Sequence, residues 1–352
     1  MRYSHGGDIY TYQNVLDFSV NINPFGPGEA VLGAVREAVP DMVHYPDSAC
    51  RELRELLSRK KELPQTYFCF GNGAAELLYL LAQAERPRIA LLPVPAFTEY
   101  ERALRSVGCE IRYVYLKKER GFDLPEDFLD QVTEDVDMIF LSSPSNPAGR
   151  VTDPGFLERL ALKCDKMHTR LLVDECFIDF TCPAAGSMEQ HTEAHPMLFV
   201  LQAFTKIFGM PGLRLGYGIC SDLALLHRMG EMCQPWNISV PAQAAGIAAL
   251  RQGFSAEKTA RYVRRERIWM EDKLEELKIE YISSEANYIL LYSPQRDLFS
   301  GLLERNILIR DCRDYRGLGE GYYRVAVKRH GENEKMLRAL EEICRQKKGG
   351  DA

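Results

Sequence analysis

The most informative stretch of this sequence is residues 198–216, LFVLQAFTKIFGMPGLRLG. Its first part has the length and apolar character of a buried strand, and Lys206 follows among apolar neighbours. A lysine removed from water has a lowered pKa, so its amine is free to form an imine with an aldehyde. Arg214 comes next, and a guanidinium can grip a phosphate through two parallel hydrogen bonds. The alternatives are a lysine that reaches from an apolar surface into water and an arginine in a surface ion pair.

The residues around this stretch indicate a mostly parallel sheet. Apolar runs of strand length occur at 67–70, 89–92, 111–115, 138–141, 171–174, 197–201 and 215–219. Amphipathic stretches at 75–83, 98–107 and 154–164 separate several of these runs and predict helices. Apolar strands that alternate with helices are typical of an α/β fold whose central sheet is covered on both faces.

The pattern changes after Pro241. A charged helical stretch is predicted from about 243 to 277, followed by strands at 288–292 and 322–327 and a last helix at 333–345. This part has the pattern of a smaller α+β domain. We therefore expect two domains, a large one formed by residues 40–240 and a small one formed by residues 1–39 together with 241–352.

Polar residues follow several predicted strands, at the edge where parallel sheets bind their ligands. Asp174 closes the apolar run 171–174, and a buried carboxylate needs a partner. Gly73 and Ala74 lie in a glycine-rich turn that opens a helix, where backbone N–H groups bind phosphate well. Each feature alone has an ordinary explanation, namely a capped turn or a common type of strand–helix connection. Together they predict one site at several strand ends.

Composition argues against several classes of function. The chain of 352 residues is 46% hydrophobic with a formal net charge of -6, which is unlike a nucleic-acid or anionic-membrane surface. We expect neither a signal peptide at the first residues nor a membrane span, because long apolar runs are missing. Ten scattered cysteines form no C-x-x-C pair, so we expect reduced thiols in a cytoplasmic protein without a metal site.

In order and spacing, these segments resemble fold-type I enzymes that depend on pyridoxal 5′-phosphate (PLP), in the aminotransferase branch that includes histidinol-phosphate aminotransferase. The resemblance covers nearly the whole chain. It implies that Lys206 bonds the cofactor covalently and that Asp174 pairs with its ring nitrogen. It also implies a homodimer. The other implied cofactor contacts are Asn146 at the ring hydroxyl, Phe97 on the ring face, Gly73, Ala74, Thr205 and Arg214 around the phosphate, and Tyr45 reaching the phosphate in the neighbouring subunit.

A narrower resemblance is to the threonine-phosphate decarboxylases of cobalamin biosynthesis. It is carried by His5-Gly6-Gly7, by residues 17–26 (DFSVNINPFG) and by Phe177, where most aminotransferases of this branch have tyrosine. It implies decarboxylation of L-threonine O-3-phosphate to (R)-1-amino-2-propanol O-2-phosphate. The alternative is that Phe177 is an ordinary core residue.

Three positions depart from the wider family. Ala203 stands where a serine or threonine usually touches the phosphate, and Ser145 and Ala148 replace asparagine and threonine in the segment around Asn146. We expect the loss of one phosphate hydrogen bond, worth about 1 kcal/mol of cofactor affinity.

The substrate contacts that we expect are Arg324, Arg310, His5 and Asn23. The resemblance places Arg324 at the α-carboxylate, whereas Arg310 and His5 are candidates for a substrate phosphate; each could instead belong to a structural ion pair.

Competing hypotheses are an aminotransferase for histidinol phosphate or a related amino acid, a PLP-binding transcription regulator and an inactive scaffold. The regulator needs a preceding winged-helix domain, for which we expect no room, and an inactive scaffold need not keep both Lys206 and Asp174.

Overall fold

The computed structural model describes residues 5–251 and 255–346. A seven-stranded sheet has the order β2-β8-β7-β6-β5-β3-β4. Its strands are β2 (Phe68–Asn72), β3 (Ile89–Val94), β4 (Glu110–Tyr115), β5 (Met138–Ser142), β6 (Arg170–Asp174), β7 (Leu198–Ala203) and β8 (Leu215–Ile219). Strand β8 is antiparallel to both of its neighbours, and the remaining pairs are parallel. Each strand overlaps a predicted apolar run, so the mostly parallel sheet is confirmed.

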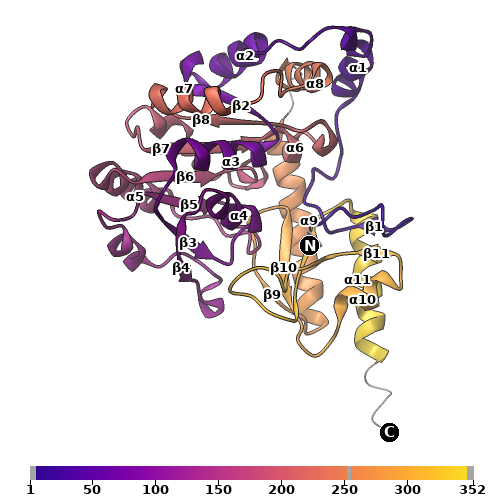
Figure 1. Ribbon diagram of the computed structural model, residues 1–352. Coiled ribbons are helices and arrows are strands. Elements are labelled where there is room, and N and C mark those ends of the chain that lie inside the picture. The colour runs from indigo at the N-terminus through magenta and orange to yellow at the C-terminus, as the bar shows by residue number, and fades with distance from the viewer. Residues whose placement is uncertain (1–4, 252–254, 347–352) are drawn as a thin grey trace.

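Both faces of the inner strands of this sheet are buried, which explains why these strands are apolar at nearly every position. In β3, for example, Ala90 and Leu92 pack in one apolar cluster and Leu91 packs in another. The first cluster includes residues of α3 (Ala74–Glu85), α4 (Thr98–Ser106) and α7 (Leu223–Met232), and the second includes residues of α2 (Arg51–Lys61), α5 (Pro154–Met167) and α8 (Val240–Arg251). Figure 1 shows this helix-covered sheet in the left part of the view.

Local sequence fixes where several of these helices begin. The Asp153 carboxylate accepts a hydrogen bond from the backbone N–H of Phe156 at 2.8 Å and so caps α5. Pro154 occupies the first turn, where its missing N–H costs no helical hydrogen bond. Helix α3 follows Gly73, whose φ of 78° lies in the left-handed region that glycine adopts without strain. These starts place helix N-termini next to the ends of the strands.

The C-terminal part forms a four-stranded antiparallel sheet in the order β12-β13-β10-β9. Its strands are β9 (Glu280–Ile282), β10 (Tyr288–Tyr292), β12 (Arg310–Asp311) and β13 (Tyr322–Ala326). Helices α9 (Ala256–Glu276), α10 (Leu298–Leu303) and α11 (His330–Gln346) lie beside this sheet, below and to the right of the first sheet in Figure 1. Strands β10 and β13 and helix α11 match the predicted elements closely.

The single helical stretch predicted for 243–277 is wrong, because two helices, α8 and α9, occupy this region. Ser255 has an extended backbone, and its hydroxyl accepts from the N–H of Lys258 at 3.3 Å, which caps the start of α9. Residues 252–254 lie outside the described residues. Helix α8 packs against α1 (Glu29–Ala38), whereas α9 packs against α11. Helical periodicity could not reveal this break because it continues on both sides. The domain boundary at 240 stays a prediction.

The N-terminal segment crosses to the C-terminal part of the chain. Strand β1 (Leu16–Asp17) pairs in parallel with β11 (Ile307–Leu308), and the carbonyl of Phe18 accepts from the N–H of Ala326 at 2.9 Å. This pairing holds residues 16–18 against the C-terminal part of the chain, whereas His5 contacts Glu99 and Asn23 contacts Ile207. In the parts of the chain that the structure describes, no helix combines the length and the apolar character needed to cross a bilayer.

Candidate active site

A cavity of about 410 Å³ lies at the carboxyl ends of the parallel strands and is lined by residues of both sheets and of the N-terminal segment. Strand β8 is reversed, so its first residue, rather than its last, lies at this edge of the sheet. The expected site residues that line the cavity are His5, Ala74, Phe97, Asn146, Asp174, Thr205, Lys206, Arg214, Arg310 and Arg324. The structure therefore brings together residues that lie far apart in the sequence.

Lys206 lies on the short helix α6 (Phe204–Ile207), directly after β7. Burial is the main cause that lowers the pKa of Lys206, and the positive charges of Arg324 and Arg214 act in the same direction. The negative charge of Asp174 opposes them only in part. The amine therefore loses its proton more readily than an ordinary lysine, which is what a nucleophilic amine requires.

Asp174 ends β6 and is 8% exposed. Its Oδ2 accepts from the Tyr100 hydroxyl at 2.6 Å, and its Oδ1 accepts from the backbone N–H of Cys176 at 2.9 Å. Burial, together with the charge of Asp174, raises the pKa of Tyr100 well above its usual value, so the phenol keeps its proton and stays a donor. The two donors fix the orientation of the carboxylate, which still has lone pairs for a protonated ring nitrogen.

Two phenylalanines form apolar walls of the cavity. Phe97 precedes α4 and packs edge-on against Tyr100, with ring centroids 5.6 Å apart. Phe177 is buried, and its ring centroid lies 5.7 Å from Nζ of Lys206. Its neighbour Tyr288 packs edge-on against it at 5.1 Å. Phe177 thus presents a ring without a hydroxyl to the cavity, so it does more than fill the core.

The phosphate end of the expected site is formed by the start of α3 and by Arg214. A methyl group at Gly73 would lie 2.3 Å from a terminal nitrogen of Arg214, so only glycine lets the guanidinium pack against this loop. A methyl group at Gly216 would likewise lie 2.4 Å from the backbone nitrogen of Ala74. Thr205 is buried and also lines the cavity. A guanidinium, a hydroxyl and the N-terminus of a twelve-residue helix form a donor set suited to a phosphate.

Arg310 and Arg324 face each other as register partners on β12 and β13, and they are 4% and 6% exposed. Arg324 donates to the side-chain oxygen of Asn146 and, at 3.2 Å, to the carbonyl of Ser19. Arg310 donates to both carboxylate oxygens of Asp314 at 2.8 Å. The buried Nε of Arg324 has no partner among the described residues. Arg310 therefore forms the ion pair named as its alternative role, with Asp314 balancing its charge, but the wall still presents two guanidinium groups, which suit a substrate with two anionic groups.

Asn23, Tyr45 and Gly73 do not line the cavity. The side-chain nitrogen of Asn23 donates to the carbonyl of Ile207 at 2.7 Å, and its oxygen accepts from the N–H of Phe25 at 3.0 Å. The structure thus places Asn23 behind α6, where it supports the helix that carries Lys206 instead of facing a substrate. Tyr45 is 77% exposed and stacks on Trp236 at 4.3 Å.

Several residues of the cavity wall received no role from the sequence. Tyr100 and Glu99 lie in the first turn of α4, and Tyr315 donates to Asn146 at 3.5 Å. Tyr100 could have been found, because it follows Phe97 by three residues and side chains at that spacing share one side of a helix. Glu99 offered no such signal, since its partner His5 comes from a distant segment.

The residues of this cavity fit PLP. The site combines an amine with a lowered pKa, an oriented carboxylate, an apolar ring wall and a phosphate-binding helix start. Glycines at 73 and 216 leave the space that this arrangement needs. Within residues 5–251 and 255–346, no group of three or more His, Cys, Asp or Glu residues could hold a metal ion.

Comparisons with known proteins agree with this geometry. The family "Aminotransferase class I and II" matches residues 13–343. Threonine-phosphate decarboxylase from Salmonella typhimurium is 35% identical over 97% of this chain and 96% of its own. Histidinol-phosphate aminotransferase from Methanosarcina mazei is 31% identical over 94% of this chain and 88% of its own. The crystal structure of histidinol-phosphate aminotransferase from Clostridium acetobutylicum superposes with a TM-score of 0.88 at 28% identity, covering 94% of this chain and all of that one.

Proposed function

This chain belongs to the aminotransferase class I and II family, and we propose that it decarboxylates L-threonine O-3-phosphate to (R)-1-amino-2-propanol O-2-phosphate. It is a PLP-dependent enzyme of the fold-type I class. The product would be a precursor of the side arm of cobalamin. The observation that carries the proposal is the pair of buried arginines, Arg310 and Arg324, on the cavity wall. A substrate with both a carboxylate and a phosphate matches these two cations, and similarity to the Salmonella decarboxylase points the same way.

The roles proposed for the residues follow from their positions. When bound, the cofactor supplies an electron-accepting ring for the electron pair that remains after a bond to Cα breaks. Asp174, oriented by Tyr100, would keep a proton on the ring nitrogen. Phe97 would cover one face of the ring, and Arg214 with the start of α3 would hold the phosphate.

Arg324 decides which bond breaks, because it orients the α-carboxylate. Its guanidinium is fixed by Asn146 and by the carbonyl of Ser19, so a carboxylate that binds to it takes one direction. Carbon dioxide leaves from that carboxylate, and Lys206 delivers a proton to Cα in its place. The products are then carbon dioxide and the amine, which keeps the phosphate.

The second candidate function is transamination of histidinol phosphate or a related amino acid. It is favoured by the similarity to histidinol-phosphate aminotransferases in sequence and in structure. Phe177 argues against it, because the cavity lacks a hydroxyl at that position. Purified holoenzyme should release carbon dioxide from L-threonine O-3-phosphate and form one equivalent of the amine. Release of no carbon dioxide, together with glutamate formation from 2-oxoglutarate and histidinol phosphate, would establish the second function instead.

We also propose a homodimer located in the cytoplasm. Exposed apolar side chains cluster near Tyr45, namely Val39, Met42, Val43 and Trp236. Such a patch suits contact with another protein surface, and Tyr45 would then reach the partner's cofactor phosphate. The ten cysteines are all unpaired, which suits a reducing compartment.

A further inference from the structure

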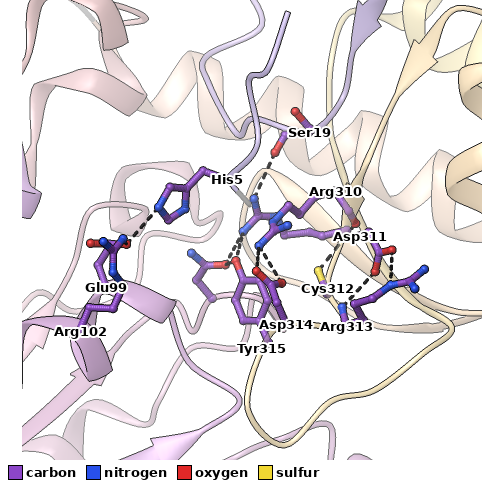
Figure 2. A network of polar contacts seen from close by, with 12 residues as sticks. His5, Ser19, Glu99, Arg102, Arg310, Asp311, Cys312, Arg313, Asp314 and Tyr315 are labelled. Atoms are coloured by element: carbon purple, nitrogen blue, oxygen red, sulfur yellow. Dashed lines mark hydrogen bonds and ion pairs between the residues drawn. The ribbon is translucent and has the colours of Figure 1, made fainter. Parts of the chain in front are cut away.

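His5 stands on the wall between two neighbouring cavities. Together with Arg310 it lines the cofactor cavity and also a second cavity of about 480 Å³. Its ring centroid lies 6.2 Å from that of Phe97. Figure 2 shows His5 reaching from the N-terminal segment toward Glu99, with Arg310 on its other side. His5 is therefore placed where the distal end of a substrate would lie.

The backbone that carries His5 is held in place. A methyl group at Gly6 would lie 2.2 Å from the carbonyl oxygen of Ser19, so the segment can pack this closely only with glycine at that position. The N–H of Gly7 donates to the Ser19 hydroxyl at 2.7 Å. The Ser19 carbonyl also accepts from Arg324, which joins the segment to the carboxylate-binding arginine.

Glu99 is the partner of His5, and it is itself fixed. Its Oε1 lies 3.0 Å from Nε2 of His5 and also accepts from Arg102, and its Oε2 accepts from the Tyr79 hydroxyl at 2.7 Å. Burial alone would raise the pKa of Glu99, but hydrogen bonds from His5, Tyr79 and Arg102 outweigh it and lower this pKa to about 2. Glu99 therefore carries a full negative charge on the cavity wall.

A neutral imidazole has one N–H group, and in His5 this group is at Nε2, where it donates to Glu99. Among the described residues no group is bonded to Nδ1. Only a ring that carries both N–H groups can donate to Glu99 and to a phosphate at the same time. From this arrangement we propose that Glu99 is a positioning residue that holds His5 as a charged donor to the substrate phosphate and so makes the site prefer phosphorylated amino acids. This inference rests on the proposed function, because it takes L-threonine O-3-phosphate as the ligand.

The test compares two ligands and uses binding instead of turnover. Holoenzyme is mixed with L-threonine O-3-phosphate or with L-threonine, and each dissociation constant is read from the initial change in cofactor absorbance. E99Q removes the charge and keeps the shape. It should weaken binding of the phosphorylated ligand about tenfold, the size of one charge-assisted hydrogen bond, and leave binding of threonine unchanged. E101Q is the matched control, because Glu101 lies on the same helix and pairs with Arg105 and Arg316 outside the cavity.

A double-mutant cycle shows whether Glu99 acts through His5. H5Q should weaken binding of L-threonine O-3-phosphate at least as much as E99Q does. The double variant H5Q/E99Q should bind this ligand no more weakly than H5Q alone. Equal weakening of both ligands by E99Q, no effect of E99Q, or additive losses in the double variant would overturn the proposal. H5Q changes a side chain that is 43% exposed, whereas that of Glu99 is 10% exposed, so H5Q should stay folded even if E99Q does not. A further outcome is that the wild type releases no carbon dioxide while E99Q still weakens binding of L-threonine O-3-phosphate and leaves binding of L-threonine unchanged. In that case the proposed function fails and the role of Glu99 stands.

Discussion

The hydroxyl of Tyr100 lies 2.6 Å from Oδ2 of Asp174, and both residues are buried. This hydrogen bond links the first turn of α4 to the end of β6. It orients the carboxylate expected to hold the ring nitrogen of PLP.

Y100F should therefore lower kcat without preventing PLP from binding. The loss of a hydrogen bond to a charged acceptor costs about 1.5–3 kcal/mol, or roughly 10–100-fold in rate if all of it falls on the transition state. Steady-state kinetics and the absorbance spectrum of the bound cofactor measure both effects. Unchanged kcat in Y100F would show that the hydroxyl only fills space.

R324K should raise KM for L-threonine O-3-phosphate roughly 10–100-fold, because an ammonium cannot replace the two-point contact of a guanidinium with a carboxylate. Thermal denaturation serves as the control, since Arg324 also donates to Asn146 and Ser19. A KM equal to that of the wild type would exclude Arg324 as the carboxylate contact.

Glu175 gives a prediction about pH. It follows Asp174, is fully buried, and accepts from the N–H of Met188 at 2.7 Å and from Gln202 at 3.1 Å. Burial raises its pKa from 4.5 to about 8. The folded protein then binds more protons than the unfolded chain between these values, so stability falls as pH rises through this window.

The expected result is a melting temperature that decreases for the wild type from about pH 5 to about pH 8 and decreases less for E175Q, which is uncharged throughout. Differential scanning calorimetry at several pH values measures this. Parallel curves for the two proteins would mean that Glu175 stays charged in the folded state.

A homodimer with shared sites predicts complementation. Y45A subunits lack the contact that we expect across the interface, and K206A subunits lack the reactive amine. A mixed dimer would contain one complete site, with Lys206 from one subunit and Tyr45 from the other. Denaturing and refolding the two variants together should restore activity above that of either alone, whereas activity no higher than their average would argue against the shared site.

The strands of the large sheet could be predicted from the sequence, because strands buried on both faces are apolar at nearly every position. Lys206 and Asp174 could be predicted as site residues because Asp174 ends one such strand and Lys206 follows another, and because the resemblance to PLP enzymes implies a role for both. The pairing of Glu99 with His5 and the hydrogen bond from Asn23 to Ile207 depend on how the N-terminal segment packs, which residue spacing alone does not specify. The break between α8 and α9 was missed because the helical pattern continues on both sides of Ser255, although Gly253 and Ser255 are residue types that mark a helix end and a helix start.

We expect the amine of Lys206 to be the group that bonds the cofactor. Borohydride reduction of the PLP-loaded protein, followed by proteolysis and mass spectrometry, tests it most directly. The expected result is one reduced pyridoxyl phosphate per chain, located on the peptide that contains Lys206 and absent from K206A. A label on another lysine, such as Lys61, or no label at all would contradict it.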